Sequence, residues 1–188
     1  MRSRSSLIVA AVVLGASATL VFSGIQGSAH DFSSTNWAAG QVCTPCHAAH
    51  GTNKNVGFLW NHELSTGPWE MRDGAVLGKA SILCLSCHDG SIALDSFGGS
   101  GGSDYINGPG NVGLDLRDDH PVGVAYPMEG NYVDKATVVA SGLKLYAGAN
   151  GDQVECASCH DVHNSTGNEK LMRLPNEMST LCLACHDM

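Results

Sequence analysis

The sequence predicts a mostly irregular chain with short helices, a small β-hairpin and a core that side chains alone do not supply. Aromatic residues make up only 6% of the 188 residues and glycine occurs 23 times, so a large side-chain core is not expected. No stretch repeats apolar residues at the spacing of a long amphipathic helix. Eight cysteines fall in four evenly spaced pairs. A group bound at these pairs is therefore expected to provide much of the buried apolar surface.

The first 29 residues have the layout of a secretory signal peptide. Arg2 and Arg4 form a basic start, residues 7–21 are mostly apolar, and residues 27–29 are small, as a cleavage site requires. An uncleaved membrane anchor is the weaker interpretation, because the apolar run is short for a bilayer span. The chain is thus expected to be exported, to the cell surface and medium or, alternatively, to the periplasm.

The mature domain is expected to cover residues 30–188 and to be strongly acidic. Removing residues 1–29 changes the net charge from −8 to −10, since two of the ten basic residues and none of the 18 acidic residues lie there. Such a chain offers no basic groove for nucleic acid. No membrane span is expected after cleavage.

Each cysteine pair has two intervening residues and is followed at once by a histidine. The four motifs are Cys43/Cys46/His47, Cys84/Cys87/His88, Cys156/Cys159/His160 and Cys182/Cys185/His186. This Cys-x-x-Cys-His pattern attaches c-type haem: the thiols add to the porphyrin vinyl groups, and the histidine becomes the proximal iron ligand. Four motifs that use every cysteine predict four covalently bound haems c.

Other uses of paired cysteines fit the pattern less well. A disulfide framework gives no reason for a histidine after each second cysteine. Zinc sites use paired cysteines but do not require the adjacent histidine. A thioredoxin-like redox motif occurs once, beside a strand and a helix, and iron–sulfur clusters favour other spacings.

The remaining histidines are the candidates for the second axial position of each iron. They are His30, His50, His62, His120 and His163. Five candidates for four irons predict bis-histidine haems with closed sites, which favours electron transfer over catalysis. Met71, Met128, Met172, Met178 and Met188 are weaker candidates, because scattered methionines more often fill gaps in apolar surface.

Spacing suggests where these candidates act. His50 and His163 each come three residues after a proximal histidine, too close in sequence to bind the same iron from its other face. We therefore expect His50 to serve the haem at Cys84/Cys87 and His163 the haem at Cys182/Cys185. His120 is held by Pro121 in an extended segment, which favours a ligand role.

His30 and His62 are left for the first haem and for a subunit boundary. His30 becomes the first mature residue if cleavage follows Ala29, and His62 lies in the more rigid segment LWNHE. We expect one of the two to complete the haem at Cys43/Cys46. The other is expected to be spare or to lie at a contact between subunits.

The motifs form two similar halves. CTPCHAAHG followed by ILCLSCHDG defines a first repeat at about residues 43–90, and CASCHDVHN followed by TLCLACHDM defines a second at 156–188. The glycine-rich segment at about residues 96–113 is expected to be an irregular connection. Short helices are expected at the motifs, and a hairpin is expected around Asn150-Gly151.

The mature chain resembles the tetrahaem outer-surface cytochromes of metal-reducing bacteria. The resemblance lies in SAHDFS, CTPCHAAH, LWNHE, LCLSCHDG, DHPVG, CASCHDVHN and LCLACH, in this order. Members of this family polymerise into extracellular filaments called cytochrome nanowires. The resemblance implies a haem-stacked multihaem cytochrome c, bis-histidine ligation and a haem ligand donated between subunits. It also implies other redox cytochromes and extracellular electron acceptors as partners.

Two further functions are compatible with the motifs. A soluble periplasmic tetrahaem shuttle would use the same closed haems as a monomer. A multihaem reductase, such as one acting on nitrite or a metal oxide, would need one open haem. The surplus of histidines and the absence of a variant motif such as Cys-x-x-Cys-Lys speak against an enzyme.

Overall fold

The computed structural model describes residues 24–188, apart from residues 54–55, 73 and 150. Most of the predicted signal peptide and Asn150 of the predicted hairpin turn thus lie outside the described residues. The helices are α1 (Lys79–His88), α2 (Lys135–Ala140), α3 (Cys156–Cys159) and α4 (Thr180–Leu183), with 3₁₀ turns η1 (Phe32–Ser34), η2 (Gly108–Gly110), η3 (Glu169–Leu171) and η4 (Glu177–Ser179). The strands are β1 (Val124–Ala125), β2 (Tyr146–Gly148) and β3 (Gly151–Val154). Most of the described chain is therefore turn and coil.

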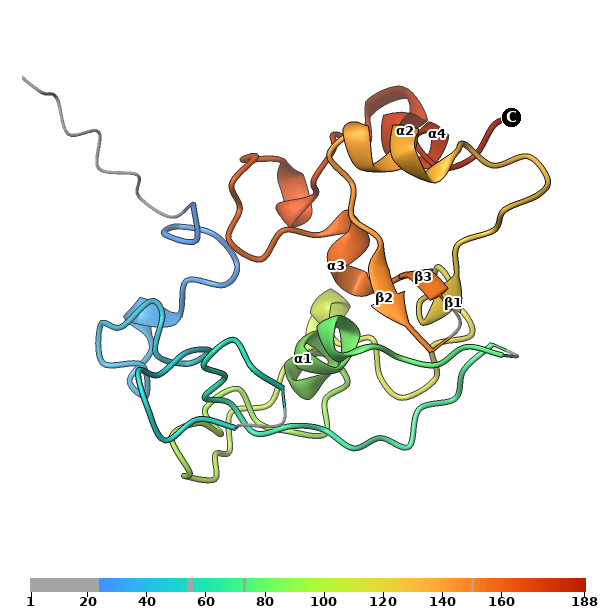
Figure 1. Cartoon of the computed structure of the whole chain (residues 1–188). Coiled ribbons are helices and arrows are strands. Elements are labelled where there is room, and N and C mark those ends of the chain that lie inside the picture. Colours follow the sequence, from blue (N-terminus) through green and yellow to red (C-terminus); the bar gives the residue numbers. More distant parts are fainter. Residues whose placement is uncertain (1–23, 54–55, 73, 150) are drawn as a thin grey trace, which may run out of the picture.

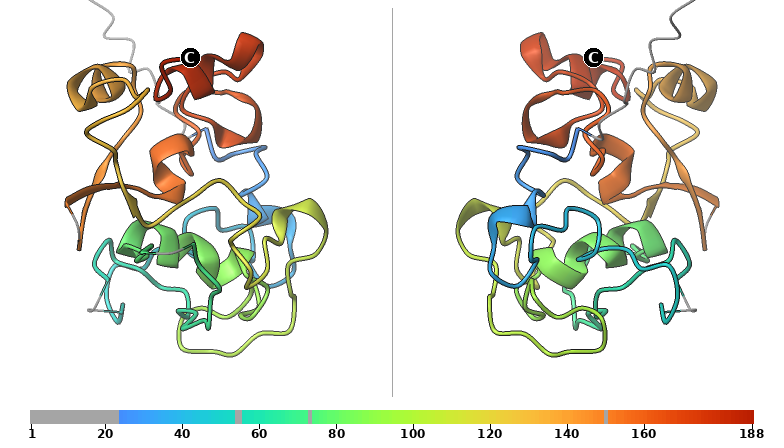
Figure 2. Two further views of the ribbon diagram at one scale, coloured as in Figure 1. Left: turned by 90° about the vertical axis from the view of Figure 1, so that its right-hand side faces the viewer. Right: turned by 90° about the vertical axis from the view of Figure 1, so that its left-hand side faces the viewer.

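The chain folds as two halves that meet where α1 lies beside α3. Figure 1 shows the first half, from blue to green, below the second half, from orange to red. The two side views in Figure 2 keep the same order, with α1 and α3 adjacent at the centre. Each of these two helices carries one Cys-x-x-Cys-His motif, so the junction between the halves lies between motifs two and three.

A small antiparallel sheet lies beside this junction. Its strand order is β1-β3-β2, with Gly148 opposite Gly151 and Val124 opposite Val154. The hairpin expected from the sequence corresponds to β2 and β3. The sequence did not indicate β1, because a two-residue strand has no measurable period.

The apolar core is small and lies in the second half. Tyr126, Val138 and Leu143 form its fully buried centre, under α2 and the sheet. Large apolar side chains remain exposed beside the motifs, among them Phe58, Leu59, Val112, Leu114, Val162, Met178 and Leu183. Apolar surface of this extent needs a cover, which the haems expected at the motifs would supply.

The longest helix, α1, ends with the second motif. It runs from the cap residue Gly78 to His88 and buries Ser81, Leu85 and Ser86 against the rest of the chain. Gly90, with a φ of +74°, turns the chain away after the helix in a conformation that favours glycine. Within the part of the chain that the structure describes, no helix combines the length and apolar character needed to cross a bilayer.

Candidate haem sites

Each Cys-x-x-Cys-His motif forms one helical turn. The backbone N–H of His47, His160 and His186 donates to the carbonyl of the first cysteine of its motif, at 2.8, 3.1 and 2.9 Å. The second motif has the same conformation because it lies within α1. Side chains three and four residues apart share one side of such a turn. Both thiols and the imidazole of each motif therefore face one bound group, as haem attachment requires.

The motifs are neighbours in the order of the sequence. Three pairs of thiols from successive motifs interact electrostatically: Cys46 with Cys87, Cys84 with Cys156, and Cys159 with Cys185. The Cys84 and Cys156 thiols also share a hydrogen bond, which raises the pKa of Cys84 and lowers that of Cys156. The thiols thus form an unbroken path from motif one to motif four.

The eight thiols are all free, and most are shielded from solvent. Burial raises the pKa of Cys87 to about 12, and the nearby Cys46 adds to this shift. Burial likewise raises the pKa of Cys159 to about 11, and the charge of Cys185 makes the second-largest contribution to this increase. Free thiols are the form that adds to the porphyrin vinyl groups to give thioether bonds.

Backbone carbonyls hold three of the four proximal imidazoles through Nδ1. The distances are 2.7 Å from His47 to the Phe58 oxygen, 2.6 Å from His88 to the Gly110 oxygen and 3.0 Å from His160 to the Lys170 oxygen. A proton on Nδ1 that is donated to a carbonyl leaves Nε2 as the free electron-pair donor. This is the tautomer that a haem iron requires from its proximal ligand.

Motifs one and three present their carbonyl acceptors in the same way. Phe58 and Leu59 have φ values of +56° and +54°, and Lys170 and Leu171 have values of +53° and +58°. Left-handed backbone is unfavourable for such side chains and persists where the surroundings require it. In both places the next residue pairs with the proximal histidine in a β-bridge, Trp60 with His47 and Met172 with His160.

Three proximal imidazoles each face a second imidazole. The ring centres are 6.2 Å apart for His47 and His163, 5.8 Å for His88 and His30, and 6.4 Å for His186 and His120. A typical bond of about 2 Å from a metal to each ring nitrogen gives roughly 6 Å between the ring centres. The spacing of all three pairs therefore fits one iron between two imidazoles.

The ring planes differ among these pairs. His47 and His163 are nearly parallel, at 12°, whereas His30 is at 87° to His88 and His120 is at 73° to His186. His30 also has a buried Nδ1 without a hydrogen-bond partner. Burial lowers the pKa of His30 to about 4, with smaller contributions from His88 and His160, so its imidazole is neutral at pH 7 and can act as a donor.

These pairs differ from the positions expected from sequence spacing. His163 lies against His47 of motif one, not beside Cys182/Cys185. His50 is exposed and not paired with His88, whose place is taken by His30. His120, which was expected to be a ligand but was assigned to no particular haem, faces His186 of motif four. Among the described residues, no histidine faces His160 in the same manner.

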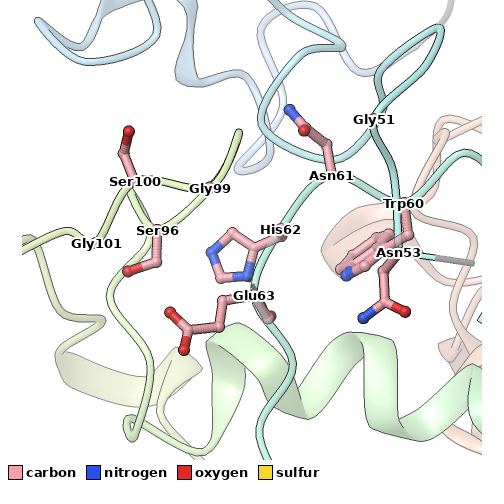
Figure 3. A pocket seen from close by; sticks show the side chains of 10 residues that line it. All are labelled: Gly51, Asn53, Trp60, Asn61, His62, Glu63, Ser96, Gly99, Ser100 and Gly101. Atoms are coloured by element: carbon pink, nitrogen blue, oxygen red, sulfur yellow. Dashed lines mark hydrogen bonds between the residues drawn. The ribbon is translucent and has the colours of Figure 1, made fainter. Parts of the chain in front are cut away.

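His62 is buried but not directed at a haem site. It lies at the wall of a hollow of about 500 Å³, where Figure 3 shows it beside Glu63 and Ser96. Its Nδ1 faces the Glu63 carbonyl at 2.8 Å and its Nε2 faces the Ala93 carbonyl at 3.0 Å. Its Nε2 is also 3.5 Å from the Cys87 sulfur. Neither ring nitrogen of His62 is therefore presented to an iron, so His62 is not placed to complete the first haem, the role expected for either His30 or His62.

Three carboxylates are buried beside motifs two and three. They are Asp89, Glu155 and Asp161. For both Asp89 and Asp161, burial works to raise the pKa, but hydrogen bonds from serine and backbone donors outweigh it and leave the pKa below its ordinary value. These residues were not predicted from the sequence, although an aspartate directly after the proximal histidine, in HDG and HDV, is a visible signal.

The arrangement argues against a tetrahedral zinc site. Among the described residues, no three histidine, cysteine or acidic side chains converge as metal ligands. Six of the nine imidazoles meet in three pairs instead. The donor set therefore fits a porphyrin, with two axial imidazoles and two thioether positions, better than a bare metal ion.

Comparisons with known proteins agree with this interpretation. Residues 148–188 match the family model described as the doubled CXXCH motif. No curated protein matches the chain. The match includes motifs three and four, and motifs one and two repeat the same pattern. Together these findings indicate a multihaem c-type cytochrome with covalently bound haem c and a role in electron transfer.

Proposed function

We propose that the protein carries electrons outside the cell through four covalently bound haems, as the subunit of a polymer. The observation that carries this proposal is the unbroken path of neighbouring thiols from motif one to motif four. Each thiol is bonded to a porphyrin edge in the loaded protein, so neighbouring thiols imply neighbouring porphyrins. An electron accepted at one end can then leave at the other end.

The exposure of the cysteines agrees with electrons entering and leaving at the two terminal motifs. Cys43 of motif one and Cys182 of motif four are exposed, whereas the other six cysteines are partly buried. The terminal haems are therefore accessible to a redox cytochrome, an extracellular acceptor or another copy of the chain. At the two central motifs all four cysteines are partly buried.

Paired imidazoles keep the irons closed. Three irons would be held between His47 and His163, between His88 and His30, and between His186 and His120. The haem supplies reversible one-electron chemistry when bound. The chain supplies the two axial nitrogens, fixes the imidazole tautomers through backbone carbonyls and keeps small molecules from the iron.

Carbon monoxide is expected to leave unchanged the three haems whose imidazole pairs lie within one chain. An iron with two imidazole ligands has no free position, so these three stay low-spin in the reduced protein at neutral pH. Visible spectra recorded before and after carbon monoxide addition measure this directly. Rapid binding by two or more haems per chain in the assembled protein would contradict the paired ligation and revive the reductase.

The haem of motif three provides the link between copies. Among the described residues, His160 belongs to no imidazole pair of this kind, although it acts electrostatically on His30, and the exposed His50 is likewise in no such pair. One unfilled axial position and one exposed imidazole on the same chain define a head-to-tail contact. A contact of this kind does not close on itself and extends into a filament. We thus assign the inter-subunit ligand to His50, in place of His30 or His62.

Replacement of His50 by alanine is expected to abolish filaments and to keep all four haems attached. One haem per chain should then bind carbon monoxide, because the iron at His160 lacks its second imidazole. Negative-stain electron microscopy measures filament yield, and Thr52→Ala in the same segment is the matched control. Normal filaments from His50→Ala would contradict this ligand assignment.

A soluble periplasmic shuttle is the second candidate. The net charge of −10 after removal of residues 1–29 favours separate copies, because like charge opposes association. Size-exclusion chromatography of the secreted wild-type protein at physiological salt separates the two functions. A single monomer peak at all concentrations would favour the shuttle, and material in the void volume would favour the polymer.

A further inference from the structure

The two halves of the chain are joined by one buried carboxylate. Glu155 is 1% exposed and directly precedes motif three. Its Oε1 accepts hydrogen bonds from the Gly78 backbone N–H, at 2.9 Å, and from the Gln153 amide. Its Oε2 accepts from the Ser81 hydroxyl. Glu155 therefore connects the start of α1 with the start of α3.

The geometry of this junction depends on close approach. A Cβ atom at Gly78 would come within 2.5 Å of Glu155 Oε1, so only glycine leaves room for the carboxylate. The Ser81 hydroxyl, which donates to Glu155, also accepts from the Cys156 backbone N–H at 3.0 Å. The N-termini of both helices, which carry partial positive charge, thus meet at a single anion.

Glu155 lies between the attachment points of the second and third haems. Its charge acts on the thiols of both Cys84 and Cys156, which are themselves in contact. Gly78, Ser81 and Gln153 all donate hydrogen bonds to its carboxyl oxygens. No lysine or arginine is buried among the described residues, so no buried cation neutralises Glu155 there.

The terminal haems lack an equivalent anion. His47 is followed by two alanines, and Asp187 after His186 is exposed. Motif two also has the buried Asp89, whose charge reaches Cys87. Asp161 at motif three is partly offset by Arg173, which acts on its carboxylate. Glu155 is thus the one buried anion that the two central sites share.

We propose that Glu155 lowers the reduction potentials of both central haems and leaves those of the terminal haems unchanged. The inference rests on the proposed four-haem function. A reduced haem carries one more electron than an oxidised haem, so a nearby anion disfavours reduction. Charge in a buried site acts more strongly than charge in water. An electron on the chain is therefore held more readily at the exposed ends, where it can be passed on.

The test is a spectroelectrochemical titration of Glu155→Gln protein that carries four haems. Haem-methyl NMR signals resolve the individual haems. Two potentials are expected to rise while two stay at their wild-type values. Glu129→Gln, which removes the same charge at an exposed position, should move none because solvent screens it. An unchanged set of potentials, or an equal shift of all four, would overturn the proposal.

Two further variants keep the test decisive. Asp89→Asn should raise the reduction potential of the motif-two haem only. This result would distinguish Glu155, which acts on both central haems, from Asp89, which acts on one. If Glu155→Gln fails to retain four haems, the potentials of Ser81→Ala protein test the proposal. This variant removes a hydrogen-bond donor to Glu155 and leaves the Glu155 carboxylate in place. A lower potential at two haems then supports the proposal, and unchanged or raised potentials overturn it. Haem quantification of the wild-type protein is done first, and fewer than four haems would refute the proposed function instead.

Discussion

Chain produced without haem attachment is expected to be unfolded. Among the described residues, only Pro45 and ten hydrophobic residues have buried apolar side chains, and the one buried hydrophobic cluster has three members. Burying about 200 Å² of each porphyrin at about 25 cal/mol per Å² contributes about 5 kcal/mol per haem. This equals the lower end of the net stability of a whole domain. The stabilising free energy lost with four haems therefore exceeds the net free energy of unfolding expected for a domain.

The measurement uses a variant in which all eight cysteines are alanine, compared with the haem-loaded wild type. Far-UV circular dichroism during urea titration should show a cooperative transition for the loaded protein only. The variant should lack a folded baseline even without urea. A cooperative transition of the variant with an m-value close to that of the loaded protein would show that side chains suffice for the fold.

The local structure of the motifs could be predicted from the sequence, because it depends on neighbours in the chain. Two thiols and an imidazole at positions i, i+3 and i+4 come to one side in a single helical turn, whatever the rest of the chain does. The β2–β3 hairpin is also local. Low aromatic content and scattered glycines likewise anticipated a chain of coil and turns.

The pairing of imidazoles could not be predicted, because it depends on contacts between distant segments. His163 comes three residues after His160 and its expected partner was the next motif in the chain. In the structure it faces His47, because motif three lies back over the first half. The ring of His30 lies against that of His88, although 58 residues separate them in the chain. Sequence spacing can exclude an iron that a histidine is too close in the chain to reach. Tertiary packing then decides which of the other irons that histidine faces.

The buried carboxylates illustrate the same limit. Glu155 reads in the sequence as an ordinary acidic residue before a cysteine. Its role emerges only when Gly78 and Ser81, more than 70 residues earlier, close around it. The carbonyls of Phe58 and Lys170 are similar: the left-handed backbone that presents them to His47 and His160 has no signature in side-chain type.

Replacement of His163 by alanine is expected to open one haem and leave filament formation intact. The iron opposite His47 loses its second imidazole, becomes high-spin and binds carbon monoxide in the reduced state. The other three haems keep both ligands, and His50 still links the copies. His62→Ala is the matched control. It removes a buried imidazole near Cys87 but should leave every haem low-spin, because both His62 nitrogens face backbone carbonyls.

Electron paramagnetic resonance of the oxidised protein identifies which haem has opened. Imidazole planes that are nearly parallel, as in His47 and His163, give a rhombic low-spin signal. Planes near a right angle, as in the pairs of His88 and His186, give a signal of larger anisotropy. His163→Ala should therefore remove the rhombic signal and retain the two anisotropic ones. If an anisotropic signal disappears instead, His163 serves another iron, and the position expected from sequence spacing, beside Cys182 and Cys185, is the one to restore.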